Sequence, residues 1–285
     1  RGADLTDAKL IGADLTNADL TGSILNGADF SGASLDNADL TGVDLMETGV
    51  SGASFVKANL TKARLGNTNL MGIDFTDAVL AGADLQRTQL TGASLSRADL
   101  SGATLTEADL TGAWLNLTNL KGVDLSGASL LGSMLIGGQL ASANLAGSDL
   151  KGTLTVGASF DGANLRGADL RQMRLTATQL ITEDLRLDPV LKSLNQLQLA
   201  GLRVNANLNG VQFDANTRWP ANTPIRGITT TVSTRLPAPS VSSTQTPATQ
   251  TAPLTATQNI TADAALSNPL ASSLVENDDA PQARH

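Results

Sequence analysis

Aspartate is the chemically active side chain that recurs at a regular spacing in this sequence. Thirteen aspartates each stand directly before the large apolar residue of a five-residue pattern, and Asp4, Asp44, Asp84 and Asp124 are examples. Two carboxylates held at a fixed separation can act as general acid and general base, and a group of them can bind calcium. The repetition favours a simpler role, in which each side chain hydrogen-bonds to the local backbone near a turn.

Side chains for other kinds of catalysis are scarce. The single histidine is His285 at the end of the chain, and there is no cysteine and no tyrosine. This composition excludes Ser–His and Cys–His nucleophilic schemes and the usual zinc sites. The sequence also lacks a phosphate-binding Gly-Lys-Ser/Thr loop and a dinucleotide fingerprint. We therefore predict a protein that is not an enzyme and that uses no cofactor, metal or small-molecule ligand.

The aspartates belong to a repeat of five residues. From residue 5 to residue 180, every fifth position is a large apolar site, and leucine fills 30 of these 36 sites. Two residues before them, alanine fills 22 of 36 positions, and other small or β-branched residues fill most of the rest. Such a repeat decides the fold, because each unit must bury its apolar side chains against its neighbours.

A period of five fits neither a helix nor a straight strand. Leucines five apart would wind round every face of an α-helix and would alternate between the two faces of a strand. They can all point to one side only if the backbone turns once in every five residues. We therefore predict a coil in which the leucine and the small residue point inward, and the residue between them points outward.

Glycine marks the corners of this coil. It fills 15 of the 18 positions from 2 to 172 in steps of ten, but only 6 of the 18 positions from 7 to 177. Because glycine accepts a positive φ more readily than other residues, we predict different turn types at alternate corners. A corner period of ten combined with a core period of five indicates an even number of sides, of which four is the natural choice.

The unit Ala-Asp/Asn-Leu, found at residues 13–15, 98–100 and 163–165 among others, resembles the repeat of the pentapeptide-repeat proteins. The resemblance covers about 180 of the 285 residues. It implies an all-β fold, a right-handed quadrilateral β-helix with twenty residues per coil and about nine coils. The family is functionally mixed, so the resemblance implies much less about activity.

The pattern divides the chain into three parts. Residues 1–180 are predicted to form the solenoid, with a repeat that weakens at 47–50 and at 153–155, the second being interpreted as a local bulge or a shifted corner. Residues 181–227 are predicted to form a C-terminal cap that contains a helix and residual repeats at 206–208 and 211–213. Residues 228–285 are rich in Ser, Thr, Pro and Ala, and we predict a disordered tail.

The cap helix is predicted over about 189–200. Asp188 and Pro189 resemble an N-cap followed by a first-turn proline. Apolar residues then follow at helical spacing, at Val190, Leu191, Leu194 and Leu197. Such a helix would cover the open end of the solenoid, where core leucines and unpaired backbone groups are otherwise exposed.

The charge is unevenly distributed. Residues 1–50 hold nine acidic and two basic residues, whereas residues 151–226 hold six acidic and nine basic residues. An acidic first third repels phosphates, so we expect no direct nucleic-acid binding, but it would attract basic partners. Acidic surface can also serve only to keep a protein soluble.

An apolar patch is the best candidate for a binding site. With four sides, outward residues twenty apart stack above one another, and one such stack is apolar where other outward positions are polar. A contiguous apolar patch usually marks a contact surface. Either a protein partner or a second copy docks on it, or the 189–200 helix or the tail folds back over it. The predicted patch comprises Trp114, Leu117, Met134, Ile136, Leu154 and Val156.

The favoured hypothesis is a non-enzymatic repeat scaffold that mediates protein–protein interaction or self-association through this patch. The second hypothesis is inhibition by DNA mimicry, because residues 1–50 are acidic. Some pentapeptide-repeat proteins, which this sequence resembles, are acidic rods that occupy the DNA site of type II topoisomerases. The third is a regulatory or targeting appendage, because the chain begins at Arg1 inside a repeat and a larger protein would have preceded it. No apolar run is long enough to span a membrane, and we expect a cytoplasmic protein.

Overall fold

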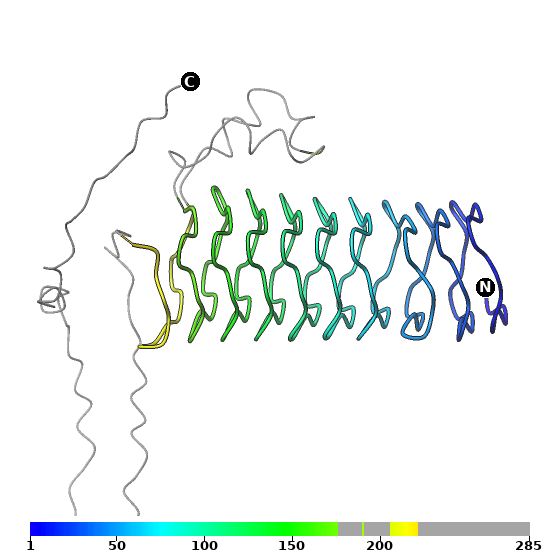
Figure 1. The fold of residues 1–285 in the computed structure, drawn as a ribbon, viewed down its shortest axis with the longest axis horizontal. Coiled ribbons are helices and arrows are strands. Elements are labelled where there is room, and N and C mark those ends of the chain that lie inside the picture. The colour runs from blue at the N-terminus through cyan, green and yellow to red at the C-terminus, as the bar shows by residue number, and fades with distance from the viewer. Residues whose placement is uncertain (176–189, 191–205, 222–285) are drawn as a thin grey trace, which may run out of the picture. The chain divides into compact units, whose positions relative to one another are not determined.

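A computed structural model of the chain describes residues 1–175, Val190 and residues 206–221 (Figure 1). The chain divides into a compact unit, Arg1–Thr234, and a second unit, Arg235–His285. All described residues belong to the first unit. The predicted tail at 228–285 lies outside the described residues, as does the predicted helix at 189–200 apart from Val190, which is helical.

The described chain winds into a parallel β-solenoid with four sides per coil (Figure 1). Each side contributes one β-bridge residue, and within residues 1–175 each bridge joins residue i to residue i+20, as between Asp84 and Thr104. We call the sides A, B, C and D, represented by residues 83–85, 88–90, 93–95 and 98–100 and by the residues stacked on them in other coils. Twenty residues per coil and four bridges per coil agree with the predicted quadrilateral coil.

Backbone hydrogen bonds run along the axis and also close each corner. The N–H of Leu85 donates to the carbonyl of Thr104 in the next coil at 2.8 Å. The N–H of Thr104 donates in turn to the carbonyl of Ala83 at 3.0 Å. At the corners, the N–H of the small residue bonds to the carbonyl of the preceding leucine, as from Ala93 to Leu90 at 3.0 Å. Each five-residue unit therefore satisfies its own turn and one rung of the ladder.

Both classes of corner adopt the same left-handed conformation. The second corner residue has a positive φ at 34 of the 35 positions from 2 to 172, with values of 54–71°. Glycine supplies some of these positions and residues such as Asn37, Arg97 and Leu117 supply others. The predicted difference between alternate corners is therefore wrong as regards φ, because non-glycine side chains at these corners point into solvent and tolerate the left-handed region.

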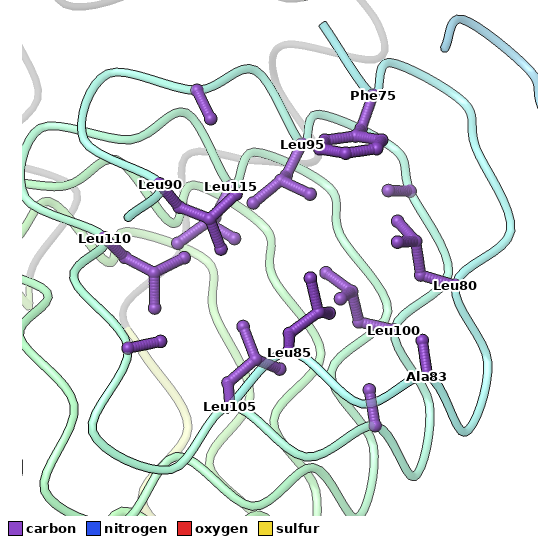
Figure 2. Close-up of a cluster of buried hydrophobic side chains, with 14 of the residues drawn as sticks. Phe75, Leu80, Ala83, Leu85, Leu90, Leu95, Leu100, Leu105, Leu110 and Leu115 are labelled. Atoms are coloured by element: carbon purple, nitrogen blue, oxygen red, sulfur yellow. The ribbon is translucent and has the colours of Figure 1, made fainter. Parts of the chain in front are cut away.

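The inward side chains form one continuous column. Nearly all leucines and alanines of the repeat are 0–3% exposed from residue 25 onward, and Figure 2 shows leucines of consecutive sides pointing toward one another. The larger rings of Phe55 and Phe75 stack on side C with centroids 5.2 Å apart. The alternation of large and small residues lets these side chains interdigitate in a narrow interior.

Within residues 1–175, the one corner without a positive φ lies at Glu47. The ladder lacks the bridges Ile24–Asp44 and Gly49–Asn69 on either side of it. The sequence predicted a weakened repeat here. The second predicted irregularity, at 153–155, is regular instead: Leu154 bridges to both neighbouring coils, and the buried Thr155 takes the leucine position.

The ladder resumes in register after a gap in the five-residue pattern. Asn207 bridges to Ser159, Gln212 to Asn164 and Arg218 to Asp169. The repeat predicts Gln179 opposite Ser159, but Asn207 occupies that place, and residues 176–180 lie outside the described residues. Sides D, A and B of the last described coil are thus built from residues 206–219. Near their end, the rings of Phe213 and Trp219 meet edge to face, with centroids 5.4 Å apart.

Candidate interaction surface

The predicted apolar patch stacks as expected on side C. Trp114 bridges to Met134, and Met134 bridges to Leu154, so the three outward side chains lie in consecutive coils. The other three predicted residues belong to the corner between sides C and D. The structure therefore brings the six predicted residues into one region of the surface.

Four of these six residues are not accessible. Met134 is 7% exposed and Leu154 1%, while Ile136 and Val156 are 0% exposed. Apolar residues at the same outward position on other sides behave differently, since Ile24 is 52% and Val79 37% exposed. Only Trp114 and Leu117 are partly exposed, so most of the predicted patch is covered.

The covered region extends to polar residues at the same corner. Asn116 lies one coil before Ile136 and Ser96 two coils before it, and both are 0% exposed. In earlier coils, the residue at this position is exposed at Thr16 and half-buried at Thr76. We call this region the covered strip, which comprises Ser96, Asn116, Met134, Ile136, Leu154 and Val156.

The outward aspartates serve the corners. In all thirteen cases, the Oδ1 atom accepts a hydrogen bond from the backbone N–H two residues later, as from Ser101 to Asp99 at 2.9 Å. The outward asparagines do the same, as at Asn144. The thirteen aspartates are Asp4, Asp14, Asp19, Asp29, Asp39, Asp44, Asp74, Asp84, Asp99, Asp109, Asp124, Asp149 and Asp169. The predicted local role of these side chains is confirmed.

These hydrogen bonds hold several carboxylates in the charged form. The hydroxyl and backbone N–H of Thr6 lower the pKa of Asp4, and Thr111 does the same for Asp109. The pKa of Asp19 falls to about 2, chiefly because Thr21 donates its hydroxyl hydrogen bond to the carboxylate. General acids of catalytic carboxylate pairs have raised pKa values, so these groups are poorly suited to that role. Among the described residues, no three acidic side chains or histidines converge on a possible metal site.

A hollow of about 410 Å³ lies beside the irregular corner. In it, Arg64 contacts Asp44 through Nη1 and Oδ2 at 2.5 Å, while Glu47 is exposed. The hollow is open to solvent and lies in the acidic third of the chain. Its lining residues are Asn26, Asp44, Met46, Glu47, Arg64, Gly66 and Asn67.

The sequence matches the family model of pentapeptide repeats in overlapping segments that together run from residue 1 to residue 180. This match covers more than half of the chain. The chain belongs to the pentapeptide-repeat family. The family resemblance predicted from the repeat unit is therefore confirmed.

Solved pentapeptide-repeat structures share this architecture. A trypsin-treated variant of QnrB1, a plasmid-mediated fluoroquinolone resistance protein, has a TM-score of 0.52 and 21% identity, covering 71% of this chain and 90% of its own. HetL, involved in heterocyst differentiation regulation in the cyanobacterium Nostoc sp. strain PCC 7120, has a TM-score of 0.39 and 26% identity, with coverages of 74% and 82%. No curated protein sequence matches the chain. The family and its solved members imply a right-handed quadrilateral β-helix for this pentapeptide-repeat protein.

Sequence reasoning located the apolar members of the covered strip and left open whether the chain itself covers them. The missed members are the polar residues Ser96 and Asn116, which look like ordinary outward residues in the repeat. The described part of this pentapeptide-repeat protein has no helix long and apolar enough to cross a membrane.

Proposed function

We propose that this pentapeptide-repeat protein is a non-enzymatic scaffold that binds a protein partner. The observation that carries this proposal is the engagement of all thirteen outward aspartates in turn hydrogen bonds. Their carboxylates are repeated structural elements and not a pair set apart for catalysis. A rigid ladder with side chains at regular intervals along four sides suits recognition of another macromolecule.

The acidic coils at the start of the chain are the surface that we assign to this partner. Asp29, Asp36, Asp39 and Glu47 are half-buried or exposed. Further along, charges are balanced between coils: Arg97 pairs with Asp77 at 2.5 Å, and Arg87 pairs with Glu107 at 2.7 Å. The unbalanced negative charge of coils one to three, which are residues 1–60, favours a partner with a basic surface.

The repeat itself supplies conservative variants for a test. Asparagine already occupies the outward position and makes the same turn bond, as from the N–H of Thr61 to Asn59 Oδ1 at 3.2 Å. Likewise, Asn116 accepts the N–H of Ile136, at the corner position that corresponds to Asp36. Aspartate-to-asparagine changes therefore remove charge and retain the turn.

The test measures binding of a fluorescent lysine-rich peptide to two variants with equal loss of charge. The first combines Asp29→Asn, Asp36→Asn, Asp39→Asn and Glu47→Gln, and the second combines Asp84→Asn, Asp99→Asn, Asp109→Asn and Asp124→Asn. We expect the first to weaken the Kd by about tenfold or more at low salt and the second by much less. Equal effects of the two variants, or no binding by the unaltered chain, would contradict the proposed surface.

DNA-mimicking inhibition of a type II topoisomerase is the second candidate. The acidic coils one to three favour it, since a mimic presents negative charge in place of phosphates. The ion pairs in coils four to six oppose it, because they interrupt a continuous acidic track. A DNA gyrase supercoiling assay tests it: inhibition near equimolar ratio supports mimicry, and unchanged supercoiling at large molar excess excludes it.

A further inference from the structure

We propose that the covered strip is an internal docking surface, occupied by the segment around Val190 that connects Leu175 to Ala206 and that the sequence predicts to be helical. This inference is independent of the proposed partner binding at coils one to three. Of the two interpretations that the sequence left open for the apolar patch, it takes the one in which the chain folds back over it.

The first support is the contrast in burial between the covered strip and apolar outward residues on other sides of the solenoid. Outward side chains cannot be covered by the next coil, because coils stack along the axis and these side chains point away from it. Ile24 and Val79 illustrate this on sides A and D, since both remain more than a third exposed. Burial of Leu154 to 1% and of Val156 to 0% therefore requires chain from outside the ladder.

The second support is where the connecting segment leaves and rejoins the solenoid. Ala206 donates its N–H to the carbonyl of Leu175 at 2.7 Å, the same bond that closes an ordinary corner between a leucine and the next small residue. This corner joins sides C and D. The covered strip lies on side C and on that same corner in the coils directly below, so the segment emerges beside the surface that needs a cover.

The third support is the character of the segment. Val190 is helical and only 6% exposed, so its side chain is packed against other groups. The apolar spacing of Val190, Leu191, Leu194 and Leu197 predicts one apolar face on this helix. The centre of the strip is equally apolar, at Met134, Ile136, Leu154 and Val156, and burying two such faces together is the main stabilisation available to both.

Polar contacts mark the same location. Ser96, Arg97, Asn116 and Arg174 each make a hydrogen-bonding or electrostatic contact in addition to those described above, and so does Val190. The first three residues lie at the corner between sides C and D, and Arg174 follows Leu154 on side C. Polar groups around an apolar centre are the arrangement expected under a packed amphipathic helix.

The test uses thiol labelling, because the natural chain contains no cysteine. The full chain with Val156→Cys is treated with a maleimide, and the full chain with Ile24→Cys serves as the accessible control. We expect Val156→Cys to label at least about tenfold more slowly, because the helix must first detach. Adding Val190→Asp should raise the rate at position 156 and leave that at position 24 unchanged. Val190→Ala gives a milder form of the same comparison if the aspartate variant does not fold.

Three results would overturn the inference. Equal labelling of Val156→Cys and Ile24→Cys would show that the strip is open. A rate at position 156 that rises on truncation after Thr234, and not with Val190→Asp, would assign the cover to the C-terminal unit. Protection that disappears on dilution would assign the cover to a second copy of the chain.

Discussion

Asn207 forms a β-bridge with Ser159 although 48 residues separate them, whereas every earlier bridge joins residues twenty apart. Asn207 thus occupies the place that the repeat predicts for Gln179. The ladder accommodates an insertion of 28 residues at one corner and then continues with the inward positions unchanged, since Ala206 and Leu208 pack against the core. Insertions at a corner leave the rungs intact because the corner bond between Ala206 and Leu175 is kept.

A deletion of residues 176–203 should therefore leave a continuous solenoid. It would leave Val204 and Asn205 between Leu175 and Ala206, which is the normal length of a corner, with asparagine at the left-handed position. We expect the Asn207 amide, which donates to Ala158 at 2.8 Å, to remain protected in hydrogen exchange. A deletion of 176–204 is the matched control, since one residue fewer shortens the corner and should abolish that protection. Similar hydrogen-exchange rates of the Asn207 amide in the two deletion variants would contradict the pairing of Asn207 with Ser159.

Asp99 offers a second prediction, on the value of the turn hydrogen bonds. Its Oδ1 accepts the Ser101 N–H at 2.9 Å and the Asn119 side-chain amide at 2.8 Å. Asp99→Ala removes both and should cost about 1–3 kcal/mol in the free energy of unfolding, measured by urea denaturation. Asp99→Asn should cost less than about 0.5 kcal/mol, because Asn144 accepts the equivalent pair of bonds from Ala146 and Asn164. Equal losses in the two variants would show that charge, and not the turn bond, is what matters.

The sequence was sufficient to predict the core and the role of the aspartates. A leucine every fifth residue has one geometric solution, and Leu100 and its equivalents point inward as that solution requires. The local hydrogen bond that Asp99 accepts from the backbone N–H of Ser101 also follows from short-range chemistry. Both features depend only on residues close in sequence.

Features that depend on distant residues were not predictable. The bridge between Ser159 and Asn207 breaks the constant spacing on which repeat detection depends. Burial of Ile136 and Val156 depends on chain outside the ladder, and nothing in their own repeat units distinguishes them from exposed residues. One local feature was not predictable either. Leu117 adopts the left-handed conformation although leucine has no preference for a positive φ.

Gly112 tests the conformational requirement of the corners. Its φ is 64°, and a Cβ atom added there would meet no atom within 4 Å, so only backbone strain opposes a larger residue. We expect Gly112→Asn to cost less than about 0.5 kcal/mol and Gly112→Val about 2 kcal/mol, because β-branched residues tolerate the left-handed region poorly. Urea denaturation measures both. Thr106→Val, at a corner position without positive φ, is the control and should be nearly neutral. A Gly112→Val variant as stable as Gly112→Asn would show that the corner can change conformation.

Stability should fall in acid because folding lowers the pKa of outward carboxylates. The pKa of Asp19 falls to about 2, mainly through the Thr21 hydroxyl, and that of Asp169 falls to about 2, mainly through hydrogen bonds from the Arg171 side chain. The ordinary aspartate pKa is 3.8, so the folded state binds fewer protons than the unfolded state between these values. This contribution to stability is fully present above about pH 4 and is lost as the pH falls toward 2.

Denaturation midpoints measured in guanidinium chloride from pH 6 to pH 2 should therefore decline mainly below pH 4. The decline should be shallower in the double variant Asp19→Asn/Asp169→Asn, because asparagine retains the turn acceptor but cannot take up a proton. The lowered pKa values of Asp4, Asp14, Asp29 and Asp109 act in the same direction, so part of the decline should remain in that variant. A midpoint that stays constant down to pH 2, or an identical slope in the variant, would show that these carboxylates keep ordinary pKa values and that the turn bonds do not favour their charged form.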